Sequence, residues 1–262
     1  MLALVTNDDG IDSPGLGVLA RCAVAAGLDV LVAAPDAESS GASAALHGAQ
    51  EDGRLVVEER RAPGVPDGVR SLAVAADPAL IAFVSAYGAF GDVPDVLLSG
   101  VNRGPNIGNA VLHSGTVGAA LSAASLGMRT LAVSLDAEDP QHWDTAEQVA
   151  AHALGWVLSA PPRRRTLNVN VPDLPRDELR GFRQAPLATF GAVHARVARG
   201  EGDDALVVRY EGTERSTEPE SDAGLLAQGW ATASLLIAPY ADETVELPGF
   251  GADTRAGRPS DA

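Results

Sequence analysis

The chain has 262 residues, enough for one large α/β domain or for one domain with a smaller appendage. Its formal net charge of −16 argues against a nucleic-acid polymer as partner, because such binding depends on a basic surface. All 19 basic residues are arginines, so chemistries that require a lysine amine are excluded, namely P-loop nucleotide hydrolysis, protein-kinase phosphate pairing and Schiff-base catalysis.

Neither a membrane span nor a secretory signal is expected. Apolar runs such as 23–28 are far shorter than the roughly 20 residues that cross a bilayer. The N-terminal segment lacks the basic start of a signal peptide, and two acids follow it closely. The single cysteine, Cys22, excludes a disulfide framework. We therefore expect a cytoplasmic protein that does not bind membranes.

Predicted strands and helices alternate along the first two thirds of the chain. An apolar run at 2–6 predicts a strand, 14–27 a helix opened by Pro14, and 29–34 a second strand, which together form a βαβ unit of a parallel sheet. Leu16, Leu19, Ala20 and Ala23 have the spacing of a helix face that packs on a core. The later elements are strands at 55–57, 69–74, 95–98, 130–134 and 167–171, helices at 78–90, 114–126 and 139–159, and a polar loop at 99–113.

The pattern changes after about residue 173. Acidic and glycine-rich segments there separate short predicted strands, such as those at 205–210 and 233–237. We expect a catalytic core at 1–172, a β-rich extension at 173–250 that belongs to the same domain, and a flexible tail at 251–262.

Polar loops at 7–10, 36–43 and 100–113 each follow a predicted strand. Because the carboxyl ends of parallel strands share one edge of a sheet, these loops are expected to form one site. Asp8 and Asp9 would point to opposite faces of a regular strand, so both reach one ion only if the strand has ended before them. Gly10 permits such a bend. Taken alone, the acid pair is more typical of a turn or helix cap than of a metal site.

The helix that starts at Ser114-Gly115-Thr116 follows a loop rich in asparagine and glycine. A helix N-terminus with hydroxyl side chains suits an anion, although simple capping by Ser114 explains that residue equally well. Two carboxylates with hydroxyl and amide oxygens suit Mg²⁺ or Mn²⁺, and such an ion can polarise a phosphoryl group and activate water. The three loops together predict a phosphoester hydrolase.

Four blocks of the sequence resemble, in order and spacing, the signature blocks of the SurE (survival protein E) nucleotidase family. The resemblance is specific over residues 1–135 and looser beyond, at 167–172, at Ser221-Asp222 and at 237–239. It implies a Rossmann-like three-layer sandwich with a mainly parallel sheet, an oligomerising C-terminal extension in a homodimer or homotetramer, and metal-dependent hydrolysis of nucleoside 5′/3′-monophosphates. The four blocks are Val5-Thr6-Asn7-Asp8-Asp9-Gly10-Ile11, Pro35-Asp36 with Ser40-Gly41-Ala42-Ser43, Ser99-Gly100-Val101-Asn102-Arg103-Gly104-Pro105-Asn106, and Ser114-Gly115-Thr116-Val117.

The resemblance also implies roles for individual residues. One divalent ion per subunit, Mg²⁺ or Mn²⁺, is expected, and water is favoured over a carboxylate as the nucleophile. Ser40 is preferred to Ser39 as a ligand because the family serine directly precedes glycine. The implied metal ligands are Asp8, Asp9, Ser40 and Asn102, the phosphate-binding residues are Asn106, Ser114, Gly115 and Thr116, and the catalytic set is Asp8, Asp9 and Asn106.

The chain departs from the family pattern on the side of the leaving group, where Ser43 and His113 are expected. His113 stands where tyrosine is usual, Ala44 replaces a common asparagine, and 76–80 differs from a Gly-Thr-Pro-x-Asp pattern. His113 could act as a general acid, although a structural histidine at a helix start is the commoner case. These departures leave open the alternative that the protein hydrolyses a specialised biosynthetic phosphate ester by the same chemistry. A non-catalytic nucleotide sensor is the alternative from another class.

Overall fold

The computed structural model describes residues 1–51, 54–161, 164–189, 193–199, 206–212 and 218–237. The strands are β1 Leu2–Thr6, β2 Asp29–Pro35, β3 Gln50–Glu51, β4 Arg54–Leu55, β5 Val57–Glu59, β6 Arg70–Val74, β7 Val96–Arg103, β8 Arg129–Asp136, β9 Arg165–Pro172, β10 Phe182–Gln184, β11 Val193–Arg199, β12 Leu206–Gly212 and β13 Ala231–Ile237. The helices are α1 Pro14–Ala25, α2 Pro78–Ser85, α3 Gly115–Ser125, α4 Trp143–Ser159, α5 Asp222–Ala227 and the 3₁₀ helix η1 Gly108–Leu112.

One sheet of nine strands, in the order β10-β13-β9-β8-β7-β1-β2-β6-β5, forms the middle layer of the molecule. The six strands from β6 to β9 in this order are parallel, while β5 and β13 are antiparallel to their neighbours β6 and β9. The parallel strands have the doubly wound order of Rossmann folds. The expected α/β class with a mainly parallel sheet is confirmed.

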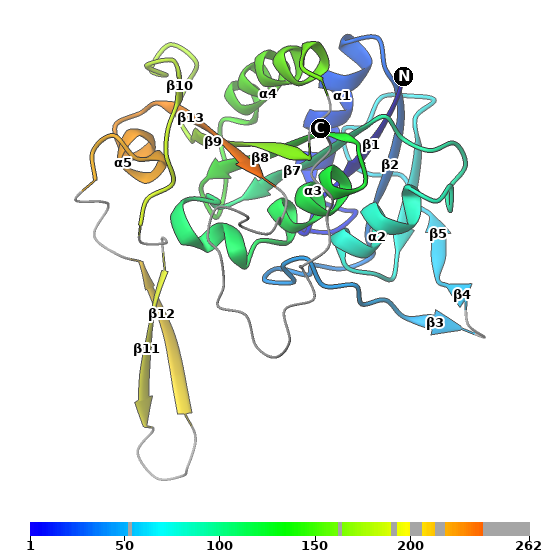
Figure 1. Cartoon of the computed structure of the whole chain (residues 1–262), viewed down its shortest axis with the longest axis horizontal. Helices are drawn as coiled ribbons and strands as arrows, with labels where there is room; N and C mark the ends of the chain where they lie inside the picture. The colour runs from blue at the N-terminus through cyan, green and yellow to red at the C-terminus, as the bar shows by residue number, and fades with distance from the viewer. Residues whose placement is uncertain (52–53, 162–163, 190–192, 200–205, 213–217, 238–262) are drawn as a thin grey trace, which may run out of the picture.

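Helices cover both faces of the sheet, so the strands are buried on both sides (Figure 1). Helices α1 and α4 pack on one face, and α2 and α3 pack on the other. The four residues predicted to form the core face of α1 are fully buried. Cys22 of the same helix is buried against α4, where its thiol lies 3.5 Å from the carbonyl oxygen of Glu147, and burial raises the pKa of this thiol to about 11.

The polar segment 99–113 differs most from its prediction as a loop. Strand β7 continues through it to Arg103, because its backbone keeps pairing with β8 past a register shift between Gly100 and Asn102. Gly100 has a φ of +118°, and a Cβ there would lie 2.2 Å from the carbonyl oxygen of Val133. Residues 108–112 form η1. The loop prediction was therefore wrong for 99–103, where backbone pairing with β8 outweighed the polar composition, and for 108–112, which is helical.

Two predicted helices are shorter than expected. The helix predicted at 78–90 ends at Ser85, and a turn follows in which Gly88 has a φ of +77°. The helix predicted at 139–159 begins at Trp143, because the backbone of His142 is not helical, with φ −113° and ψ 54°. The backbone N–H groups of Gln141 and His142 donate to the carboxylate of Asp173.

The C-terminal part of the chain adds strands to the same sheet. β13 pairs with β9, and β10 pairs with β13, whereas β11 and β12 form a separate antiparallel hairpin. A domain boundary at residue 172 stays a prediction, and the tail predicted at 251–262 lies outside the described residues. Among the described helices, none is both long and apolar enough to cross a bilayer.

Candidate active site

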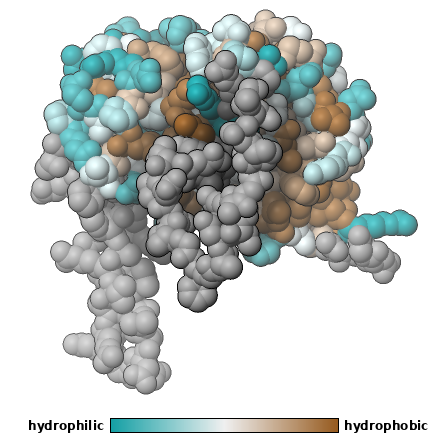
Figure 2. Space-filling view, in the orientation of Figure 1, coloured by the Kyte–Doolittle hydropathy of each residue, from teal (hydrophilic) through white to brown (hydrophobic). Residues whose placement is uncertain are grey.

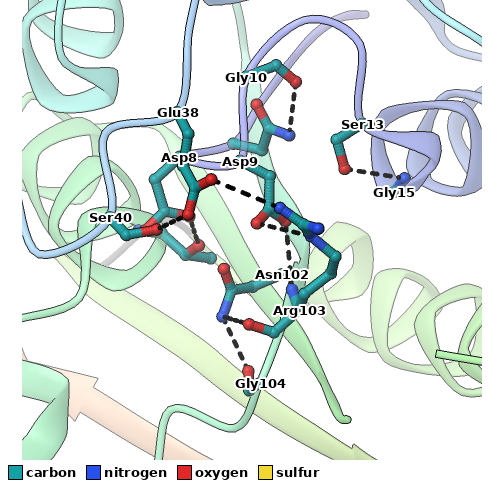
Figure 3. Close-up of polar contacts among 12 residues, drawn as sticks. Asp8, Asp9, Gly10, Ser13, Gly15, Glu38, Ser40, Asn102, Arg103 and Gly104 are labelled. Atoms are coloured by element: carbon teal, nitrogen blue, oxygen red, sulfur yellow. Dashed lines mark hydrogen bonds and ion pairs between the residues drawn. The ribbon is translucent and has the colours of Figure 1, made fainter. Parts of the chain in front are cut away.

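The candidate site lies where the order of the parallel strands reverses, between β1 and β7. From β1 the chain proceeds to β2 on one side, while β7 pairs with the other side of β1. Open α/β sheets bind their ligands at the carboxyl ends of the strands that flank such a reversal. Figure 3 shows residues of three loops gathered at this edge, with Asp8 and Asp9 after β1, Ser40 after β2 and Asn102 at the end of β7.

The turn after β1 brings both acids to one place. β1 ends at Thr6, before the two acids, as expected. The side chains of Asp8 and Asp9 therefore need not point to opposite faces of the sheet. Gly10 has a φ of +93°, and its carbonyl oxygen accepts a hydrogen bond of 3.0 Å from the side-chain amide of the buried Asn7. The carbonyl oxygen of Asp8 accepts from the backbone N–H of Ser39 at 2.8 Å. The first two loops are thereby tied together.

Asp8 is buried against the start of α3. Its carboxylate accepts hydrogen bonds from the Thr116 hydroxyl and, at 3.1 Å, from the Thr116 backbone N–H. A Cβ at Gly115 would lie 2.8 Å from the Cβ of Asp8, so only glycine allows this approach. Burial raises the pKa of Asp8 above its ordinary value, although the bonds from Thr116 oppose the rise.

Asp9 pairs with Arg103, a residue that was not among the predicted site residues. The Arg103 backbone N–H and its Nε each lie 3.2 Å from an oxygen of Asp9. Burial, followed by the negative charge of Asp8, raises the pKa of Asp9, and the contacts with Arg103 partly offset the rise. A cation beside the acid pair would therefore relieve both the burial cost and the repulsion. The signal for Arg103 was its place directly after Asn102.

Glu38 is a further acid at this edge that was not predicted. Its carboxylate accepts a hydrogen bond of 2.8 Å from the Ser40 hydroxyl, and it lies 3.7 Å from the Arg103 guanidinium. Ser40 itself is exposed, so its hydroxyl is accessible from solvent.

The oxygens at this edge fit a hard divalent cation. The side-chain nitrogen of Asn102 donates to the carbonyl oxygens of Arg103 and Gly104, at 3.1 and 2.8 Å. Its amide oxygen is thereby turned toward the acid pair (Figure 3). Within the described residues, no three His, Cys, Asp or Glu side chains converge as a metal cluster. Carboxylate, amide and hydroxyl oxygens suit Mg²⁺ or Mn²⁺ better than zinc.

Asn106 is held in place by side chains of β8 and β9. Its side-chain nitrogen donates to the Ser134 hydroxyl at 2.8 Å, and its backbone N–H donates to the side-chain oxygen of Asn170 at 2.7 Å. Its carbonyl oxygen accepts from the side-chain nitrogens of Asn168 and Asn170, both at 2.9 Å. The three supporting residues were not predicted. Asn168 and Asn170 alternate along one strand, a pattern that could have indicated a shared polar face.

The start of α3 is already engaged by the protein. Ser114 caps the helix, since its hydroxyl oxygen accepts from the Val117 backbone N–H at 3.0 Å. The hydroxyl of Thr116 donates to Asp8, and Gly115 packs on the same acid. The N-terminal dipole of α3 therefore acts first on Asp8. The phosphate-binding role of these three residues stays a prediction.

The residues predicted on the leaving-group side lie at the rim. Ser43 has a φ of +56°, and its hydroxyl donates to the carbonyl oxygen of Leu112 at 2.7 Å, which ties the second loop to η1. The second loop also packs on α3, because a Cβ at Gly118 would lie 2.1 Å from the carbonyl oxygen of Ser43. His113 follows η1 and is exposed.

Comparison with known proteins gives a family model and many relatives. The model described as "Survival protein SurE" matches residues 3–193. A 5′/3′-nucleotidase SurE from Erwinia tasmaniensis is 33% identical over 239 residues, which cover 90% of each chain. A 5′-nucleotidase SurE from Methylococcus capsulatus is 34% identical over 239 residues, which cover 90% of this chain and 91% of the relative.

A solved structure has the same fold. The crystal structure of the SurE protein from Aquifex aeolicus superposes with a TM-score of 0.76 at 24% sequence identity, over 92% of this chain and 95% of that one. The family model covers most of the chain, and the curated relatives align along nearly its whole length. The chain therefore belongs to the survival protein SurE family, and the resemblance noted in the sequence is confirmed.

Proposed function

We propose that this protein is a metal-dependent phosphomonoesterase that hydrolyses nucleoside 5′/3′-monophosphates to nucleoside and phosphate. The observation that carries the proposal is the acid pair Asp8 and Asp9, held together at the strand reversal beside the amide oxygen of Asn102. The curated relatives named as nucleotidases, which align with nine tenths of the chain, support the same reaction.

One Mg²⁺ or Mn²⁺ ion per subunit is proposed, with Asp8, Asp9, Ser40 and Asn102 as its ligands. When bound, the ion supplies positive charge for the phosphoryl group and lowers the pKa of water. Thr116 and Gly115 hold the carboxylate of Asp8 in one orientation. The Ser40 hydroxyl donates to Glu38 and so keeps its own lone pairs for the ion, and each oxygen of Asp9 accepts one bond from Arg103 and keeps a further lone pair.

The phosphate is proposed to bind between Asn106 and the start of α3, at Ser114, Gly115 and Thr116. Asn106 suits this role because its side-chain nitrogen donates a hydrogen bond of 2.8 Å to the Ser134 hydroxyl, while side chains of β9 hydrogen-bond its backbone. The side-chain position is therefore set before substrate arrives, which lowers the cost of ordering it in the transition state.

The test measures phosphate release from a panel of nucleoside 5′- and 3′-monophosphates and of non-nucleotide esters, with Mn²⁺ or Mg²⁺. Asp8→Ala and Asp9→Ala are each expected to lower kcat by at least about 10³-fold, since they remove metal ligands. The matched control is Asp12→Ala, which removes an exposed acid of the same loop and should leave kcat unchanged. Undiminished release by Asp8→Ala contradicts the proposal.

The same panel separates the alternatives. Turnover of another ester but of no nucleotide would favour a specialised biosynthetic substrate, which the departures at Ala44 and His113 motivate. Nucleotide binding without any turnover would favour the sensor.

We also propose that the C-terminal extension joins subunits in a homodimer or homotetramer. An isolated two-stranded hairpin is marginally stable in water, so β11 and β12 are expected to need a partner surface. Apolar surface is exposed in addition on the side of α2 (Figure 2), where Phe83 is 36% exposed and packs against Tyr87, which is 70% exposed. Light scattering of the full chain tests this, and a strict monomer contradicts it. A cytoplasmic location stays a prediction.

A further inference from the structure

The segment that carries Asn106 is also held from the C-terminal part of the chain, through Asp222. One carboxylate oxygen of Asp222 accepts from the backbone N–H of Gly108 at 2.9 Å. The other accepts from the N–H groups of Ala188 and Ala223, both at 2.8 Å. Asp222 is fully buried. A single buried carboxylate therefore joins three parts of the chain, namely the segment after β7, the segment around Ala188 after β10, and the start of α5.

The chemistry of this junction requires a group that only accepts hydrogen bonds. All three partners are backbone N–H donors, and an ionised carboxylate has acceptors on both oxygens. An asparagine in its place would turn an N–H₂ group toward at least one of these donors. That donor would lose its partner in a buried environment, which is costly.

A second contact joins the same segment to the base of the hairpin. The side-chain nitrogen of Asn109 donates to the carbonyl oxygen of Thr189 at 2.6 Å. Thr189 in turn donates its backbone N–H and its hydroxyl to the carboxylate of Glu218. Thr189 and Glu218 flank the part of the sequence that contains β11 and β12. The hairpin base is thus linked to the residues directly after Asn106.

We propose that Asp222 is a positioning residue for phosphate cleavage, because it fixes segment 106–109. Together with Asn109, it makes the placement of Asn106 depend on the C-terminal part of the chain. At its other end the segment is held by Asn170 on β9. A displacement at the hairpin base, as on contact with a second subunit, therefore reaches Asn106 through the bonds at Gly108 and Asn109. This inference rests on the proposed function of Asn106.

The test compares Asp222→Asn with Asp173→Asn in the full chain. Asp173 is a matched control, because its carboxylate also accepts from backbone N–H groups, those of Gln141 and His142 at the start of α4. Asp222→Asn is expected to lower kcat about 10-fold and to raise the inhibition constant of inorganic phosphate about 10-fold, because a small displacement of a binding group suffices for this. Its Mn²⁺-induced shift in Tm should equal that of the wild type.

Asp173→Asn should lose comparable thermal stability and keep kcat within about 2-fold of the wild type. Asn109→Ala provides a second variant in case Asp222→Asn does not fold. Asn109 is exposed and loses one hydrogen bond, so a fall in kcat of about 3-fold with a matching rise in the phosphate inhibition constant is expected.

Four results would each overturn the inference. The first is that Asp222→Asn keeps the kcat and the phosphate inhibition of the wild type, and the second is that Asp222→Asn and Asp173→Asn lose kcat equally. The third is that Asp222→Asn loses its Mn²⁺ response, and the fourth, if Asp222→Asn does not fold, is that phosphate inhibition is unchanged in Asn109→Ala. The proposed function fails separately. The proposed function is contradicted if the wild type releases no phosphate or if Asp8→Ala remains active. If the wild type is active and Asp8→Ala is inactive, the results above test only the role of Asp222.

Discussion

The loops after β1 and β7 meet at one edge of the sheet but are held in different ways. The turn at Asp8 and Asp9 is shaped within a few residues, by the positive φ of Gly10 and by the hydrogen bond from Asn7 to Gly10. The segment around Asn106 depends on side chains 28, 64 and 114 residues away in the sequence. The backbone of the turn on the metal side of the site is therefore shaped locally, whereas the segment on the phosphate side is held by residues distant in the sequence.

The strongest test of this contrast is Asp8→Asn. The variant loses a charged metal ligand, so kcat should fall by at least about 10³-fold. Its fold should gain stability, because asparagine can keep both bonds to Thr116, whose hydroxyl can accept instead of donate, while the buried charge disappears. Calorimetry of the metal-free protein should show Tm higher by about 2 to 4 °C, the change that roughly 1 kcal/mol produces in a domain of this size. A lower Tm would contradict the assignment of Asp8 as a destabilising buried charge.

Asn170→Ala tests the distant support of the phosphate side. It removes two of the hydrogen bonds that hold the backbone of Asn106, so we expect kcat to fall about 10- to 100-fold and the free energy of unfolding to fall by about 2 kcal/mol. Urea unfolding and steady-state kinetics measure the two effects. Asn168→Ala is the control, because it removes a single bond to the same carbonyl oxygen and should cost less in both. Equal losses in the two variants would contradict the specific role of Asn170.

The pH dependence of stability should separate the two sides further. Burial raises the pKa values of Asp8 and Asp9, so the metal-free fold binds their protons more tightly than the unfolded chain does. The two carboxyl groups therefore contribute their full stabilisation below the pKa of an aspartate in the unfolded chain, about 4. They lose it as the pH rises through their raised pKa values in the folded protein. The unfolding free energy of Asp8→Asn minus that of the wild type should therefore grow as pH rises from 4, and then level off. Urea unfolding in the presence of a chelator measures it, and a constant difference would contradict the raised pKa of Asp8.

The smallest effect is expected at His113. Its side chain is exposed, so His113→Gln should change the free energy of unfolding by less than about 0.5 kcal/mol. We expect kcat to stay within about 3-fold of the wild type. A general-acid role predicts instead a loss of about 100-fold or more, with a change in the pH profile of kcat. Kinetics from pH 5 to 9 distinguish these outcomes.

The contrast between the loops also explains what could be predicted from the sequence. The strands, the bend at Gly10 and the helix start at Ser114 follow from periodicity, glycine and capping residues close in the chain. Arg103, Ser134, Asn170 and Asp222 act through contacts between distant segments, and of these only Asn170 carries a periodic signal, its alternation with Asn168 along β9. Segment 99–113 was misjudged for the same reason, since its polar residues predict a loop while pairing with β8 makes part of it a strand.

The burial of Cys22 has a practical consequence for following the segment around Asn106. The chain has a single cysteine, and its thiol is buried with a pKa of about 11, so thiol reagents at neutral pH should leave it unmodified. A cysteine introduced at the exposed Leu112 would then be the one reactive thiol. A fluorophore attached there could report motion beside segment 106–109 without prior removal of the native cysteine.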